Sequence, residues 1–194
     1  MGRGLDLEVK GLKETVAAID KVSPAAKKKL EGVIQWGTSR LDREVKILAT
    51  RKVKVRSGRY RSSITAELLD NLTGRVGSNL EYAGMIEFGT KHLPGGVLKP
   101  RNSRFLAIPL DAAKTAAGVP RSPKDYIDTF VKKGPSGNLI IWGRKDLSTP
   151  DPVPLFALVT QVTIKGRGVF REARGRISPT IVRRAQDAIA EVTR

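Results

Sequence analysis

The chain has 194 residues, of which 40% are hydrophobic, and carries 36 lysines and arginines against 19 aspartates and glutamates, a formal net charge of +17. This composition excludes a disordered chain, a disulfide framework and a thiolate metal site, and no apolar run approaches the roughly 18 residues of a membrane-spanning helix. A charge of this size favours an anionic partner, which can be nucleic acid, an acidic protein or an anionic membrane.

The first quarter of the chain predicts one strand and two helices. Residues 5–9 alternate apolar and charged side chains, as a strand does. Apolar residues at helical spacing predict a short helix over Leu12–Ile19 and a long amphipathic helix from about Pro24 to Ala49. Ser23 and Pro24 are favoured residues at a helix start, and Gly37 inside the long helix indicates a close helix crossing or a bend.

From Lys52 to Leu68 the period changes to two, which predicts a strand, and residues 70–74 predict a hairpin turn to a strand around Val76. Residues Gly74–Thr90, GRVGSNLEYAGMIEFGT, hold neither the helical nor the strand period from end to end. They predict a strand, a turn, a short helical piece and a corner that ends at glycine. Residue types leave open whether this segment only turns the chain in the core or presents side chains to a partner.

The second half of the chain begins with a loop rich in proline and glycine, followed by a short apolar strand over Arg104–Leu110. Residues 111–153 are interpreted as an inserted elaboration, with a helix from Ser122-Pro123 to Gly134 and a strand over Asn138–Trp142. Apolar residues on both faces of Leu155–Lys165 predict a central strand.

A third Ser-Pro pair, Ser178-Pro179, predicts the start of a C-terminal helix. Taken together, the periods predict one α+β domain over residues 1–194. We expect a mostly antiparallel sheet, packed by the long helix of the N-terminal half and by the C-terminal helix.

Patterns that would support catalysis are weak. His92 is the one histidine and has no second ligand at metal-binding spacing. Glu81 and Glu87 could form an acid–base pair, but no other residue supports that interpretation. The segment Gly166-Arg167-Gly168 lacks the third glycine of a phosphate-binding loop. We therefore expect a chain that is not an enzyme, with no catalytic residues, cofactor or metal.

The densest basic run lies between residues 51 and 61, and no acidic residue occurs from 45 to 66. Such a run is either an ordinary solvated face or a strip that faces DNA or an acidic partner. Zinc-finger spacing and the aromatic pattern of RNA-binding sheets are both missing, so sequence-specific recognition is not indicated. Contact with a phosphate backbone stays open.

The succession of VRSGRYRSSI, GRVGSNLEYAGMIEFGT, RFLAIPL and a basic C-terminal helix resembles the tail-completion or neck proteins of tailed bacteriophages. Ser57–Ile64 match the first motif of that family, with Tyr60 in place of the usual leucine. Val76–Asn79, Tyr82-Ala83 and Glu87–Thr90 match the second. Length and layout are similar to those of the phage lambda tail-completion protein Z, and later segments are similar to the phage Mu G-like virion morphogenesis proteins. Residues 111–153 depart from the shorter members.

The resemblance implies a structural virion protein of the phage neck, which completes the tail and joins it to the head. It implies a homo-oligomeric ring, by analogy with tail symmetry a hexamer, around a channel for genomic DNA. The implied partners are further copies of the chain and other neck, head-completion and tail-tube or tail-terminator proteins, without a membrane. The implied location is the virion, and the host cytoplasm during assembly.

Two sets of residues carry these expectations. The subunit or partner interface is expected at Arg59, Tyr60, Arg61, Tyr82, Glu87, Phe88 and Thr90. A DNA channel is expected to face Arg51, Lys52, Lys54 and Arg56. The alternative function is that of a free architectural protein that binds nucleic acid without sequence preference.

Overall fold

The structure, a computed structural model, describes residues 5–9, 24–53, 58–116, 118–135, 137–145, 147–148 and 150–192. The chain divides into two compact units, Met1–His92 with Lys165–Arg194 and Leu93–Ile164. The prediction from the sequence was a single domain with an elaboration at 111–153. That elaboration lies inside the second unit, which extends beyond it at both ends.

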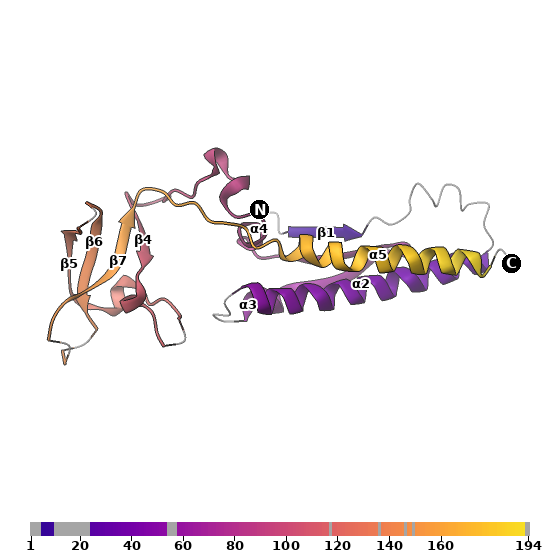
Figure 1. Cartoon of the computed structure of the whole chain (residues 1–194), viewed down its shortest axis with the longest axis horizontal. Coiled ribbons are helices and arrows are strands. Elements are labelled where there is room, and N and C mark those ends of the chain that lie inside the picture. The colour runs from indigo at the N-terminus through magenta and orange to yellow at the C-terminus, as the bar shows by residue number, and fades with distance from the viewer. Residues whose placement is uncertain are drawn as a thin grey trace. The chain divides into compact units, whose positions relative to one another are not determined.

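Two long helices dominate the first unit, α2 (Pro24–Lys52) and α5 (Val169–Ala190). They lie side by side and run antiparallel, as Figure 1 shows, and ion pairs join Lys29 to Glu191 at one end and Lys52 to Glu172 at the other. A Cβ atom on Gly37 would lie 2.9 Å from Cδ1 of Ile181, so the glycine permits a close helix crossing, as its position inside the long helix predicted.

The C-terminal helix starts earlier than predicted, at Val169, and Pro179 lies inside it. Ser178 and Pro179 therefore do not begin the helix. Its first turns bury Val169, Phe170 and Ala173, so packing against the core extends the helix upstream of the proline.

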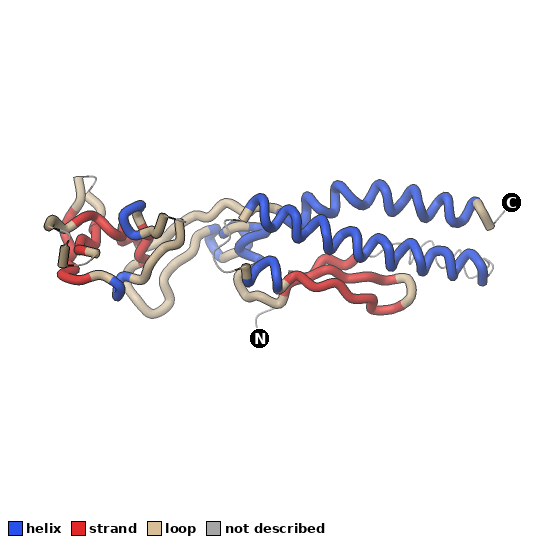
Figure 2. Tube along the Cα trace, turned by 90° about the horizontal axis from the view of Figure 1, so that it is seen from below, coloured by secondary structure: helices blue, strands red, loops and turns tan. Residues whose placement is uncertain are grey.

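A three-stranded antiparallel sheet of order β1-β3-β2 completes the first unit, and α2 runs between this sheet and α5 in Figure 2. Its strands are β1 (Leu5–Val9), β2 (Ile64–Asp70) and β3 (Thr73–Ser78). The strand predicted from Lys52 begins only at Ile64, because α2 continues to Lys52 and a short helix, α3 (Arg59–Ser62), precedes β2. The helix predicted over Leu12–Ile19 lies outside the described residues.

The segment after β3 follows the prediction. A turn leads to α4 (Ala83–Phe88), which ends at Gly89 with a φ of 68°. The core of the first unit joins side chains of α2, α3, β2, β3, α4 and α5, among them Leu41, Val45, Leu48, Tyr60, Ile64, Val76, Ala83 and Phe170.

The second unit is a four-stranded antiparallel sheet of order β4-β7-β6-β5. Its strands are β4 (Leu106–Pro109), β5 (Ile127–Lys133), β6 (Leu139–Arg144) and β7 (Val153–Val159). The predicted central strand is β7, although it ends six residues earlier than expected. A small core of Ala113, Tyr126, Leu155 and Phe156 holds this unit together.

The helix predicted from Ser122 to Gly134 is wrong. Ser122 and Asp125 form a capping box, but it caps a single 3-10 turn, Pro123–Asp125. The β-branched and aromatic residues that follow pair with β6 instead, since Phe130 lies opposite Trp142 and Val131 opposite Ile141.

The α+β class with antiparallel sheets, a long helix in the N-terminal half and a C-terminal helix is confirmed. Within the described residues, no helix combines the length and the apolar character needed to cross a membrane.

Candidate functional site

Glu87, in the last turn of α4, is buried and holds the start of α5. Its side-chain oxygens accept hydrogen bonds of 2.9 Å from the backbone amides of Phe170 and Arg171. These amides lie in the first turn of α5, where the helix supplies no acceptor of its own, and Gly168 before them has no side chain to offer one. A carboxylate also interacts favourably with the positive end of the helix dipole. Glu87 therefore replaces a local helix cap.

Backbone contacts reinforce this junction. The amide of Gly168 donates to the carbonyl of Glu87 at 3.1 Å, and the amide of Arg167 donates to the carbonyl of Ile86 at 2.6 Å. Gly89 and Lys165 form an antiparallel bridge. We call the two segments that meet here, 86–89 and 165–171, the Glu87 clasp.

The glycine at 166 is a steric requirement of the clasp. A Cβ atom there would lie 2.4 Å from the carbonyl oxygen of Glu87 and 2.5 Å from the carbonyl carbon of Phe88. Both are backbone atoms, which cannot rotate away as a flexible side chain can. Gly166 thus lets the returning chain pass directly against the end of α4.

Tyr60 of α3 lies next to the clasp. Its ring is buried, and its hydroxyl has no hydrogen-bond partner among the described residues. Burial raises the pKa of Tyr60, and the negative charge of Glu87 and the nearby Tyr82 raise it further. The phenol is therefore neutral at physiological pH. Tyr60 of α3 and Ala83 of α4 belong to the same buried cluster.

The seven residues predicted for a partner interface separate into two groups. Tyr60, Glu87 and Thr90 are buried inside the first unit. Arg59, Arg61, Tyr82 and Phe88 are exposed. Backbone amides of α5 occupy both carboxylate oxygens of Glu87. The four exposed residues can therefore touch a partner, whereas the three buried ones belong to the interior of the unit.

Two of the exposed members, Tyr82 and Phe88, are aromatic and lie at the two ends of α4. Tyr82 and Phe88 are 44% and 49% exposed, so a large part of each ring is accessible to a partner. The ring of Phe88 meets the ring of His92 edge to face, with centroids 6.2 Å apart. Aromatic and arginine side chains are enriched at protein interfaces, so this surface has an interface-like composition.

The residues predicted to face a DNA channel have different environments. Lys52 donates to the carbonyl of Arg167 at 3.0 Å and pairs with Glu172, so it fastens α2 to α5. Arg51 is exposed. Lys54 and Arg56 lie outside the described residues.

Sequence reasoning missed the neighbours of Arg51. Together with Arg43, Lys46 and Arg61 it lines a groove of about 460 Å³ along α2 and α3. The spacing of residues 43, 47, 50 and 51 along one helix face was a signal that could have indicated it. Arg61 was not predicted to join them, because its segment was predicted as a strand.

The weak acid–base pair gains no support. Glu81 is exposed, whereas Glu87 is buried and bound to backbone amides. In the described part of the chain no three His, Cys, Asp or Glu side chains gather as a metal site would require.

Residues 13–89 match the model of a family described as "Bacteriophage HK97-gp10, putative tail-component". The matched stretch includes α2, α3, β2, β3 and α4 and ends at Gly89, the corner of the Glu87 clasp. The match supports the resemblance to phage tail proteins and, with it, a structural role in the virion. No curated protein and no solved structure matched the chain significantly.

Proposed function

We propose that the chain is a structural protein of the phage neck, which completes the tail and joins it to the head as part of a homo-oligomeric ring around the DNA channel. The observation that carries this proposal is the family match over residues 13–89, which covers α2, the hairpin β2–β3 and the glycine corner. The resemblance of the sequence to lambda Z-like and Mu G-like proteins supports a position at the top of the tail. The role is non-enzymatic.

The exposed surface of α3 and α4 supports a ring. Tyr82 and Phe88 expose two aromatic rings at α4, beside the clasp, and Arg59 adds an exposed guanidinium group on α3. A ring needs a heterologous contact, in which this surface meets a different surface of the next copy. The clasp supports such a contact by fixing α4 to the first turn of α5, which limits the entropy lost when a partner binds.

Other neck, head-completion and tail-tube or tail-terminator proteins are the proposed partners outside the ring. The protein resides in the virion and, during assembly, in the host cytoplasm. The proposed number of six chains in the ring rests only on analogy with the symmetry of phage tails.

Native mass spectrometry of the purified full chain tests the oligomer. We expect a discrete species of six chains, or of another single ring size, with closed rings in electron micrographs of the same sample. A chain that stays monomeric both when purified and in particles would contradict the proposal.

The rival function is a free architectural protein that binds nucleic acid without sequence preference. The charge of +17 favours it. It predicts steeply salt-dependent DNA binding by a monomer, and the mass measurement in the presence and absence of DNA distinguishes the two functions.

A further inference from the structure

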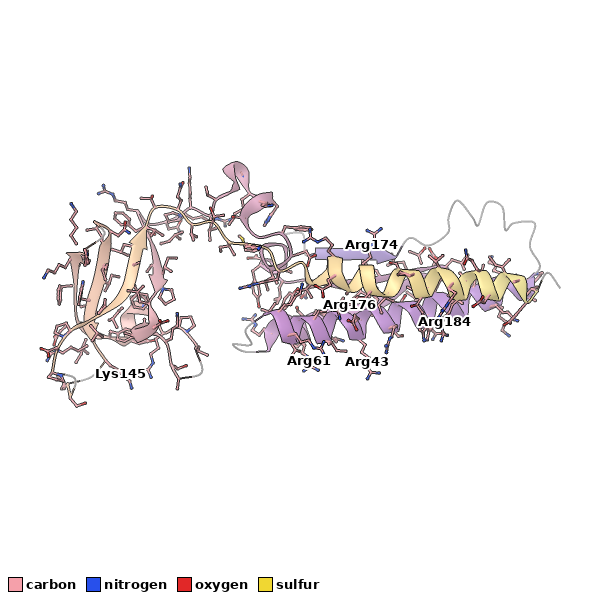
Figure 3. The ribbon with its side chains drawn as sticks, in the orientation of Figure 1. Arg43, Arg61, Lys145, Arg174, Arg176 and Arg184 are labelled. Carbon is pink, nitrogen blue, oxygen red and sulfur yellow. The ribbon has the colours of Figure 1, made fainter. Side chains whose placement is uncertain are left out.

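Three arginines of the α2–α3 groove have no carboxylate partner in the part of the chain that the structure describes. Arg43, Arg51 and Arg61 are exposed and make no ion pair within the described residues, whereas Lys46 in the same groove pairs with Asp42 at 2.8 Å. Figure 3 shows Arg43 and Arg61 on the side of α2 that faces away from α5. Like charges that gather without a counter-charge repel one another, so an anion in the groove is favoured.

The arrangement fits an extended anion better than a small one. Arg43 and Arg51 are eight residues apart on α2, a rise of about 12 Å, and Arg61 comes from a second helix. The guanidinium groups therefore form a row along an open groove instead of converging on one point. A row of cations suits a polymer with regularly repeated charges.

The rest of the groove has few groups that could recognise the side chains of a protein partner. The remaining lining residues are Asp42, whose carboxylate pairs with Lys46, the half-buried Ile47, and Thr50, whose hydroxyl already donates to the carbonyl of Lys46 at 2.9 Å. Recognition there is by charge, which is how a protein contacts a phosphate backbone without reading sequence.

A second copy of the chain is a poor occupant of this groove. Every copy carries a net charge of +17, and acidic residues such as Glu67, Asp111, Asp128, Glu172 and Glu191 are already paired with cations of their own chain. A larger groove of about 770 Å³ between α2 and α5 has Asp187 and Glu191 in its lining, so the α2–α3 groove is the more cationic of the two.

We propose that the α2–α3 groove, through Arg43, Arg51 and Arg61, binds the phosphodiester backbone of duplex DNA. The inference deepens the proposed function and rests on it for the choice of duplex DNA as the polyanion. Arg51 was predicted from the sequence to face DNA, and Arg43 and Arg61 belong to the same row. Lys52 was also predicted to face DNA but does not belong to the row, because it pairs with Glu172. Guanidinium groups bind phosphate oxygens in bidentate fashion, so arginine is better suited to this contact than lysine.

The test measures binding of the full chain to a 30-base-pair duplex by fluorescence anisotropy over a range of salt concentrations. The variant carries R43Q, R51Q and R61Q together. The matched control carries R174Q, R183Q and K145Q, which remove three positive charges from exposed positions that have no ion pair in the described part of the chain. Circular dichroism verifies that both variants are folded, and the single variant R51Q provides a milder change.

We expect the slope of log K against log salt concentration to become shallower by about 2.7 in the groove variant, since each lost phosphate contact contributes about 0.9. The slope should change by about one third of that amount in R51Q, and by less than the contribution of one phosphate contact in the control. Equal losses in groove and control variants, or no loss in either, would overturn the inference.

A poly-glutamate peptide serves as the acidic-protein probe. If the groove variant lost binding to the peptide but kept binding to duplex DNA, the groove would be a protein-binding surface and the inference would fail. Native mass spectrometry of the same samples separates this failure from that of the proposed function. Rings that persist while DNA binding is unchanged contradict the groove inference alone, and a chain that forms no ring contradicts the proposed function.

Discussion

The carboxylate of Glu87 accepts a hydrogen bond of 2.9 Å from the backbone amide of Phe170, 83 residues later in the chain. This contact, with its counterpart at Arg171, joins the end of α4 to the first turn of α5. It also gives a structural reason for the Glu-Phe-Gly-Thr sequence that carries the resemblance to phage neck proteins. The glutamate caps a helix, and the glycine turns the chain at the same place.

Removing the carboxylate at 87 should destabilise the first unit. We expect Glu87→Ala to lower the free energy of unfolding by about 2–3 kcal/mol, because two helix amides lose their acceptor, and Glu87→Gln by about 1–2 kcal/mol. Denaturant unfolding measures both. Glu81→Gln changes an exposed carboxylate of the same segment and should stay within about 0.5 kcal/mol of the parent. Equal effects at the two positions would show that the clasp contributes no stability.

Gly166→Ala should also weaken the clasp. The added methyl group would meet the backbone of Glu87 and Phe88, so we expect a loss of about 1–3 kcal/mol. Gly32→Ala is the matched control, because no heavy atom lies within 4 Å of the added carbon and alanine favours the helix by about 1 kcal/mol. Thermal melting should therefore shift in opposite directions for the two variants. An unchanged melting temperature for Gly166→Ala would argue against the close approach of residue 166 to the backbone of Glu87 and Phe88.

Acid should weaken the contact between α2 and α5. The hydrogen bond from Lys52 lowers the pKa of Glu172 below its usual 4.5, with further help from Arg176. A carboxylate whose pKa is lower in the folded state than in the unfolded state stabilises the fold above the unfolded pKa, and this contribution disappears as the pH falls through the folded pKa. Glu172→Gln should therefore reduce stability at pH 7, and its difference from the parent should shrink at pH 3.

Denaturant midpoints at the two pH values measure this effect. The ion pairs are exposed, so high salt should reduce the difference at pH 7 as well. A difference that is the same at pH 7 and pH 3 would mean that Glu172 contributes through packing and not through its charge.

The double variant Tyr82→Ala with Phe88→Ala tests the exposed surface of α3 and α4. Both side chains are close to half exposed, so we expect each change to cost about 0.5 kcal/mol or less in stability while the oligomer dissociates. Native mass spectrometry measures the oligomer. Val182→Ala, at a residue of α5 that is 55% exposed, should leave it intact. Oligomers that survive the double variant would place the contact elsewhere.

Local patterns were sufficient for most of the fold. The apolar stripe of α2, the turn between β2 and β3 and the glycine corner after α4 were predicted within a few residues, although the start of β2 was not. Each depends on side chains that are close together in sequence, such as the recurrent Leu41, Val45 and Leu48 on one helix face.

The errors share a different cause. The start of α5 was placed ten residues late, at Pro179, because its cap is Glu87 and no nearby residue reveals that. Similarly, Ile127–Lys133 has apolar residues that fit a short helix as well as a strand, and pairing with β6 decides between them. The arginine groove needed Arg61 on a helix, which only the contact of α3 with α2 establishes.

We propose that the chain forms a ring in the phage neck. Cryo-electron microscopy of tailed particles that contain the chain, with an antibody fragment bound to a tag on it, locates the copies within the virion. We predict a closed ring of identical copies around the DNA channel at the junction of head and tail. Label found only on the head shell or the distal tail, or as single copies without rotational symmetry, would contradict the claim.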